Sequence, residues 1–193
     1  MFVQAIAVSF RRVSVRRQVL ALALGVCGFA AAMVLSAHVK VPLPFSPVPV
    51  SLQTMVVLLS GATLGALGGA ASQVLYLGLG TMGMPVFTAG GGLEVLAGPT
   101  AGYLLAFPLT AWLVGRLARR REAWALPPAL LAGTLLILLL GSAWLVVGCG
   151  RSVPEAAMLG FVPFLAGDTL KLVAAGALAP ILRRGYQAAA GHH

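Results

Sequence analysis

Two ionisable side chains lie inside an apolar stretch near the C-terminus, in the segment G-D-T-L-K at 167–171. Asp168 and Lys171 are three residues apart, so a helix places them on one face. Ionisable groups are costly in hydrocarbon and mark a functional site by default, but these two can neutralise each other. The pair therefore suits two roles, an ion pair that holds helices together or a contact for a polar ligand. In the second role the carboxylate accepts hydrogen bonds from N–H groups of the ligand, and the ammonium donates a hydrogen bond to a carbonyl oxygen of the ligand.

A second polar pair, Gln73 and Tyr76, is also spaced by three residues within an apolar run. An amide and a phenol on one helix face can hydrogen-bond either a ligand or a neighbouring helix, and contact between helices is the commoner use. Glu94 follows three consecutive glycines at 90–92. We interpret it as a solvated charge at the rim of a site.

No catalytic or metal-binding pattern is present in the sequence. The motifs H-E-x-x-H and G-x-S-x-G and the Walker phosphate loop are all missing. Cys27 and Cys149 have no metal-ligand spacing, and we interpret both as small buried residues. His192 and His193 end the chain as part of a tail. We therefore predict no enzyme activity, no metal and no cofactor.

The elements that position these side chains must lie in a membrane. Of the 193 residues, 60% are hydrophobic and 9% are charged, and the mean hydropathy is +0.99. A soluble protein carries roughly 25% charged residues. The length allows about six spans of about 20 residues. We predict a single all-α domain over 1–193, with a basic segment at 1–17, a six-helix bundle at 18–183 and a tail at 184–193.

The predicted spans are separated by two irregular stretches and by basic clusters. Four prolines between 42 and 49 forbid a helix there, which predicts an extended hairpin or lid. Three glycines make 81–98 irregular as well, and such backbone must pack in protein or line a wet cavity. The predicted spans are 18–37, 51–65, 66–79, 100–114, 125–147 and 156–182.

Charge distribution predicts the orientation of the bundle. Ten of the thirteen Lys and Arg residues fall in clusters at 11–17, 116–121 and 183–184. The positive-inside rule places such clusters in the cytoplasm, and no aromatic interleaving accompanies them, so we expect no nucleic acid partner. With six spans both termini are then cytoplasmic, and the two irregular stretches are extracytoplasmic. We expect a multi-pass protein of the cell membrane with lipid as its surroundings.

Four ordered blocks of sequence carry a resemblance to a known family. They are V-P-L-P-F-S-P-V-P-V-S-L-Q-T at 41–54, G-L-G-T-M-G-M-P-V-F at 78–87, G-P-T-A-G-Y at 98–103 with Phe107-Pro108, and G-D-T-L-K at 167–171. In these blocks the chain resembles the BioY family, the biotin-binding S components of energy-coupling-factor vitamin transporters. The resemblance covers nearly all of the chain beyond residue 17.

The resemblance implies a six-helix bundle that binds biotin near its extracytoplasmic side. It implies that Asp168 and Lys171 contact the ureido ring and that a polar residue of the third span assists them, for which Gln73 and Tyr76 are the candidates. The loops at 41–54 and 84–92 are expected to close over the ligand, which adds the candidate contacts Phe87, Gly90 and Gly91.

The same resemblance implies a transmembrane coupling protein and a pair of ATPases as partners. Small residues at Gly28, Ala32 and Ser36 form a stripe on the first span, and such stripes let helices approach closely in lipid. The stripe can face another helix of this chain or a coupling protein. Two other functions stay open at this point, a ligandless assembly protein of the membrane and a stand-alone secondary biotin transporter.

Overall fold

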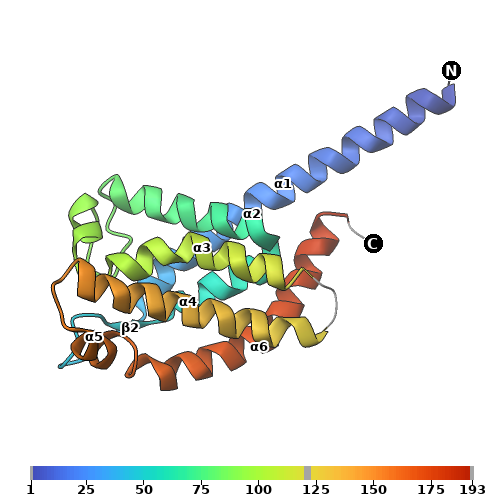
Figure 1. The fold of residues 1–193 in the computed structure, drawn as a ribbon. Coiled ribbons are helices and arrows are strands. Elements are labelled where there is room, and N and C mark those ends of the chain that lie inside the picture. Colours follow the sequence, from blue (N-terminus) through green and yellow to red (C-terminus); the bar gives the residue numbers. More distant parts are fainter. Residues whose placement is uncertain (1, 120–122, 192–193) are drawn as a thin grey trace.

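The computed structural model describes residues 2–119 and 123–191, so Arg120, Arg121, His192 and His193 lie outside the described residues. The described chain is a bundle of helices with one short β-hairpin (Figure 1). The α-helices are α1 (Phe2–His38), α2 (Gln53–Thr81), α3 (Ala101–Leu117), α4 (Leu126–Val147), α5 (Val153–Gly160) and α6 (Phe164–Ala189). The short elements are β1 (Lys40–Val41), β2 (Val50–Ser51) and the 3₁₀ helices η1 (Leu93–Ala97) and η2 (Ala123–Ala125).

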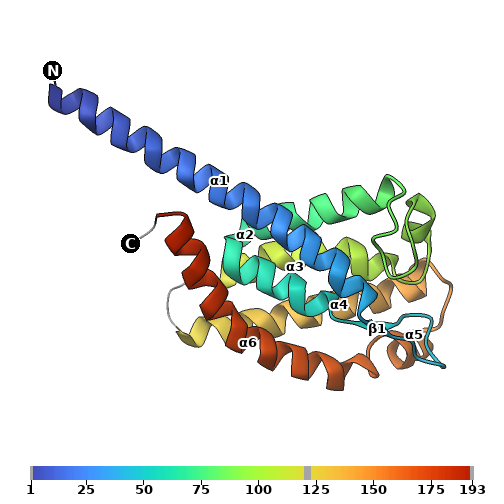
Figure 2. The same ribbon diagram turned by 180° about the vertical axis from the view of Figure 1, so that it is seen from behind.

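Helix α2 reverses direction at Gly65. Its backbone there has φ 77° and ψ −178°, a conformation that favours glycine because it has no Cβ. The two halves lie side by side and run in opposite directions (Figures 1 and 2). They touch at Gly61 and Gly69, where a Cβ on Gly69 would lie 2.7 Å from the Cα of Gly61. The predicted boundary between the spans 51–65 and 66–79 is thereby confirmed.

The predicted span 156–182 is wrong as a single helix, because the structure divides it into α5 and α6. Pro163 lies at the break and becomes the N-cap of α6. A proline lacks a backbone N–H and clashes with the preceding turn, so a helix does not continue through it easily. Helix α6 then extends to Ala189, and most of the predicted tail at 184–193 is helical.

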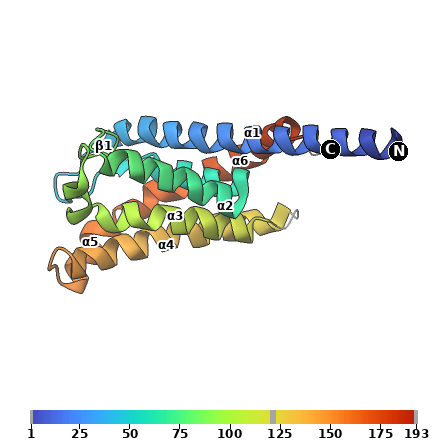
Figure 3. The same cartoon turned by 90° about the horizontal axis from the view of Figure 1, so that it is seen from above.

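Within the described residues, four helices are long and apolar enough to cross a membrane, namely α2, α4, α6 and residues 15–38 of α1. Helix α3 is a shorter apolar helix. Helix α1 has 37 residues and is therefore about 55 Å long, well beyond the roughly 30 Å of the hydrocarbon core. Its N-terminal part projects beyond the other helices (Figure 3). Residues 2–17 of the predicted basic segment are therefore part of the first helix.

Connecting segments gather at the end of the bundle opposite the two termini (Figure 1). The proline-rich stretch forms the antiparallel β1–β2 hairpin, with Lys40 opposite Ser51, as predicted. The Lys40 ammonium donates to the carbonyl oxygen of Thr88 and so joins this hairpin to the loop 82–92. Helix α5 begins with a capping box between Ser152 and Glu155. Hydrogen bonds from Ser152 hold the pKa of the Glu155 carboxyl below its usual value.

Candidate ligand-binding site

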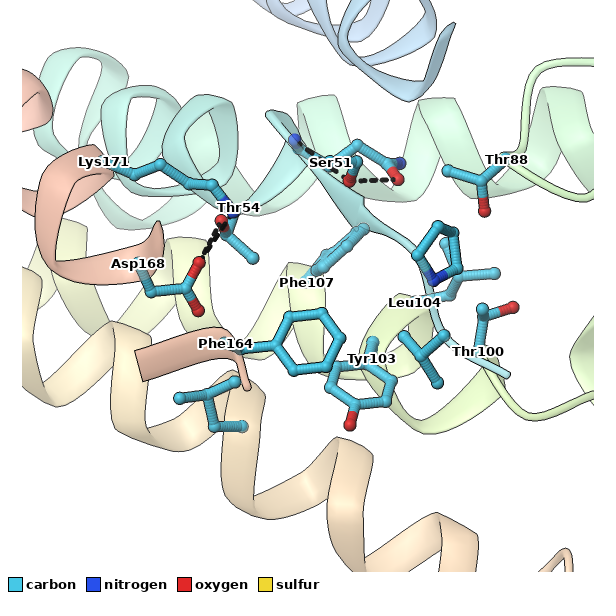
Figure 4. Close-up of a pocket in the computed structure, with 14 residues that line it drawn as sticks. Ser51, Thr54, Thr88, Thr100, Tyr103, Leu104, Phe107, Phe164, Asp168 and Lys171 are labelled. Carbon is cyan, nitrogen blue, oxygen red and sulfur yellow. Dashed lines mark hydrogen bonds and ion pairs between the residues drawn. The ribbon is translucent and has the colours of Figure 1, made fainter. Parts of the chain in front are cut away.

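A small cavity lies among the helices near the connecting segments. Its volume is about 40 Å³. The lining residues come from the β1–β2 hairpin, the loop at 88, the start of α2, helix α3, helix α4 and the start of α6 (Figure 4). In Figure 4, Asp168 and Lys171 lie at one end, the rings of Phe107, Phe164 and Tyr103 lie in the middle, and Thr88 and Thr100 lie at the other end.

The polar end of the cavity is a buried ion pair with one acceptor left over. Lys171 Nζ lies 2.7 Å from Asp168 Oδ1, and the Thr54 hydroxyl donates to the same oxygen at 3.2 Å. Asp168 is 2% exposed and Lys171 is 8% exposed. The second carboxylate oxygen, Asp168 Oδ2, is buried without a hydrogen-bond partner among the described residues. An unsatisfied buried acceptor is costly, so this oxygen is ready to accept a donor from a ligand.

Gln53 lines the cavity beside Thr54 and is held by a chain of hydrogen bonds. Its Nε2 donates to the Tyr76 hydroxyl at 2.7 Å, and that hydroxyl donates to the carbonyl oxygen of Val86 at 3.1 Å. The Ser51 hydroxyl donates to Gln53 Oε1 at 3.2 Å. One residue of the site is thereby tied to the loop 82–92 on one side and to the hairpin on the other.

Aromatic rings form the apolar walls. The Tyr103 and Phe164 ring centroids are 6.1 Å apart, and the Tyr103 hydroxyl donates to the carbonyl oxygen of Gly160 at 2.6 Å, which joins α3 to the end of α5. Leu104, Phe107 and Leu138 complete the wall. A free carboxylate oxygen, an ammonium and flat rings together suit a compact heterocycle that carries N–H donors and a carbonyl acceptor.

A wider cavity of about 360 Å³ lies outside this one and shares Pro49, Thr88 and Thr100 with it. Glu94 lines the outer cavity and its side chain is exposed, in agreement with its interpretation as a rim charge. Pro49, Thr88 and Thr100 thus lie between the outer cavity and the inner one. Among the described residues no cluster of His, Cys, Asp and Glu could hold a metal ion.

Comparison with known proteins decides the family. The model of the BioY family matches residues 8–188. This chain belongs to the BioY family. The family match covers all the helices that line the cavity, and it makes the chain a multi-pass membrane protein of a transporter family.

Named relatives agree with this assignment. The chain is 40% identical to the biotin transporter BioY of Thermotoga maritima over 81% of this chain and 92% of that protein. It is 36% identical to the biotin transporter BioY of Rhodobacter capsulatus, over 78% and 87% of the two chains. Among solved structures, the S-component for biotin from an ECF-type ABC transporter matches with a TM-score of 0.76 and 26% identity, covering 88% of this chain and 92% of that one.

The structure brings only some of the predicted site residues together. Asp168 and Lys171 line the cavity side by side. Gln73 is fully buried but lies away from it, and its amide donates to the hydroxyls of Ser60 and Ser72. Tyr76 lies behind Gln53 and reaches the cavity only through that side chain.

The three predicted contacts from the loop 84–92 also lie outside the inner cavity. Phe87 is buried against Gly80 and packs edge-on against Tyr76, with ring centroids 5.4 Å apart. Gly90 pairs with Phe87, and a Cβ on Gly91 would lie 2.1 Å from the carbonyl oxygen of Met84. These residues shape the loop, and Thr88 is its member that reaches the cavity.

Sequence reasoning missed Gln53, Thr54, Tyr103 and Phe164 as cavity residues. A signal for the first two is present, because three polar residues, Ser51, Gln53 and Thr54, open an apolar helix directly after the proline-rich stretch. No comparable signal marks the aromatic residues, since apolar side chains are abundant throughout the chain.

Proposed function

We propose that this chain binds biotin in the inner cavity and carries it across the plasma membrane. The observation that supports this most directly is the unpaired Oδ2 of Asp168 beside the Lys171 ammonium. A ureido ring offers N–H donors for the carboxylate and a carbonyl oxygen for the ammonium. Phe107, Phe164 and Tyr103 then flank the fused rings, and the tail of the vitamin points toward Thr88 and Thr100.

Binding requires the cavity to expand. Small-molecule sites have volumes of roughly 300–1,000 Å³, whereas the inner cavity has about 40 Å³. The hairpin and the loop 82–92 are the elements that separate it from the outer cavity, and the Lys40–Thr88 contact joins them. We propose that both segments move apart to admit biotin and close again over it. Ligand contacts then shift a population that exists without ligand.

In the proposed topology the chain crosses the membrane six times and has both termini in the cytoplasm. The six passes are α1, the two halves of α2, α3, α4 and α6. Arg116, Arg119 and Arg183 line one cavity beside the C-terminal end of α3. That end of α3 lies toward the two termini, and the β1–β2 hairpin and α5 lie at the other end of the bundle (Figures 1 and 2). This distribution supports the proposed cytoplasmic side for the termini, and in that orientation the proposed ligand site lies toward the extracytoplasmic side.

A coupling protein and two ATPases complete the proposed transporter. The small-residue stripe on α1 supports a docking surface only at its N-terminal end. Gly28 is exposed with open space beside it, whereas Ser36 is 5% exposed and its hydroxyl donates to Met33 within the helix. Ala32 is half-buried and packs against the core, so the proposed contact centres on Gly28. Uptake of biotin by cells that lack the ATPases would instead favour the stand-alone transporter.

Replacing Asp168 by Asn tests the ligand assignment. The change keeps the side-chain shape and removes the charge that strengthens the hydrogen bonds from the ureido N–H groups. A hydrogen bond to a charged group contributes about 1.5–3 kcal/mol, so biotin affinity should fall by about one to two orders of magnitude. Equilibrium dialysis of the purified chain with radiolabelled biotin measures it.

Glu94→Gln is the matched control, since it removes an exposed carboxylate from the rim. The affinity of Glu94→Gln for biotin should stay close to that of the unaltered chain. If Asp168→Asn is folded and binds biotin with unchanged affinity, the ion pair only holds helices together. If the unaltered chain binds no biotin, the ligandless alternative is favoured.

A further inference from the structure

The largest cavity among those described lies at the opposite end of the bundle from the ligand site and has no part in ligand binding. Its volume is about 550 Å³. Its lining residues come from α1, the turn between the two halves of α2, the end of α3 with the residues that follow it, and the last turns of α6. Three of its lining residues are arginines, namely Arg116, Arg119 and Arg183, and none of its lining residues in the described ranges is acidic.

Two of these arginines are held in place by neighbouring groups. Arg183 Nη1 donates to the carbonyl oxygen of Ala118 at 3.0 Å, which leaves the other N–H groups of its guanidinium for a second partner. The Arg116 guanidinium lies over the Trp112 ring, 5.9 Å from its centroid. Donors that are fixed in advance lose less conformational entropy when an anion binds.

An unsatisfied polar group lies in the same wall. Thr63 is 7% exposed, and its hydroxyl has no hydrogen-bond partner among the described residues. It directly precedes the Gly65 turn, after which the second half of α2 begins, and both line the cavity. The first turn of a helix presents backbone N–H groups and a positive dipole end, which attract anions. Three arginines, a residue with a buried unpaired hydroxyl and a helix start thus line one cavity.

The rim of the cavity is apolar. Leu67 is 81% exposed, and Leu22 and Trp112 are each 39% exposed. In a multi-pass membrane protein such side chains face acyl chains, and an aromatic residue beside a basic cluster is typical of the headgroup level. A soluble anion does not contact the apolar rim. A phospholipid contacts the arginines with its headgroup and the apolar rim with its acyl chains.

We propose that this cavity binds the phosphodiester headgroup of an anionic phospholipid, with the arginines and Thr63 at the phosphate and the acyl chains along Leu22, Leu67 and Trp112. The bound lipid joins α2, α3 and α6 at the end where Gly65 breaks α2. Lipid that binds only the folded chain stabilises it by mass action.

Native mass spectrometry of the detergent-purified full chain tests this proposal, with phosphatidylglycerol and phosphatidylcholine as probes. Phosphatidylglycerol should be retained preferentially and should raise the melting temperature. Arg116→Gln and Arg119→Gln should each weaken its retention by about tenfold or more, because each removes charge-assisted hydrogen bonds to phosphate. Arg184→Gln is the matched control, since it removes the same charge next to Arg183 from a residue outside the cavity lining, and its effect should stay below about twofold.

Thr63→Val provides a second variant that does not depend on charge. It removes an unsatisfied hydroxyl without changing the side-chain shape, so the lipid-free melting temperature should stay the same or rise. Retention of phosphatidylglycerol should nevertheless weaken several-fold. This opposite response of stability and binding is not expected of a residue that only packs.

Four results would overturn the proposal. Equal retention of phosphatidylcholine would show that the cavity does not recognise the charge of the headgroup. Equal losses of phosphatidylglycerol retention in Arg184→Gln and Arg116→Gln would show only diffuse electrostatic attraction. Displacement of the lipid by glycerol 3-phosphate or inorganic phosphate at matched concentration would identify a soluble anion. Arginine variants that keep phosphatidylglycerol but no longer co-purify with a coupling protein would assign the cavity to a protein segment.

Discussion

Replacing Tyr76 by Phe should loosen the ligand site without touching its lining. The Tyr76 side chain is fully buried, and its hydroxyl joins the Gln53 amide, at 2.7 Å, to the Val86 carbonyl oxygen, at 3.1 Å. The variant leaves both groups without this partner. A buried polar group that loses its partner costs roughly 1–3 kcal/mol, so two such groups should lower the free energy of unfolding by about 2–6 kcal/mol. The ring itself still packs against Phe87.

The effect on binding should appear mainly in the rate of biotin release. Gln53 loses the contact that orients it, and the loop 82–92 loses an anchor, so the closed state is destabilised relative to the open one. A loss of about 1.4 kcal/mol in the closed state corresponds to about tenfold faster release. Release of radiolabelled biotin after dilution into excess unlabelled biotin measures this rate, and thermal unfolding measures the stability.

Tyr186→Phe is the control, because Tyr186 lines the basic cavity at the other end of the bundle. It should leave the release rate unchanged. A Tyr76→Phe chain that is less stable but releases biotin at the original rate would show that the hydrogen-bond chain supports the fold alone. Unchanged stability as well as unchanged release would refute the reasoning altogether.

Two further predictions concern topology and coupling. In a chain without Cys27 and Cys149, cysteine at Ser46 or Ser152 should react with an impermeant thiol reagent in intact cells and cysteine at Ala118 should not, and the reverse pattern would contradict the proposed orientation. Gly28→Leu fills open space on α1, so it should reduce ATP-dependent biotin uptake severalfold while biotin binding to the isolated chain is unchanged; unchanged uptake would place docking on another helix.

The fold could be predicted well wherever one residue type restricts the backbone. The prolines between 42 and 49 excluded a helix, and the structure has a hairpin there. Gly65 ended the second predicted span, and the reversal of α2 occurs at that residue. The break at Pro163 was missed because the residues around it are as apolar as a span, so hydropathy alone runs through it. Helix α1 was predicted too short because arginines are good helix formers that do not end a helix.

The site residues could be predicted only where a polar side chain stands in an apolar stretch of sequence. Asp168 and Lys171 stand out among apolar residues, and they are paired inside a cavity. Gln73 stands out equally, yet it bonds with Ser60 on the antiparallel half of α2. Helical spacing shows which residues share a face but not whether that face meets a cavity or another helix. The contribution of Gln53 depends on Tyr76, which is 23 residues away in the chain, and no local pattern reports such a contact.

The small volume of the inner cavity has a consequence for the electrical integrity of the membrane. A water molecule occupies roughly 10–15 Å³ of such space, so the 40 Å³ beside Asp168 and Lys171 has room for about three. Beyond them lie tightly packed stretches in which Gly61 and Gly69 bring two helix backbones into contact. Three waters cannot form a continuous file across about 30 Å of hydrocarbon. The inner cavity by itself therefore offers Asp168 and Lys171 no file of water long enough to carry protons across the membrane.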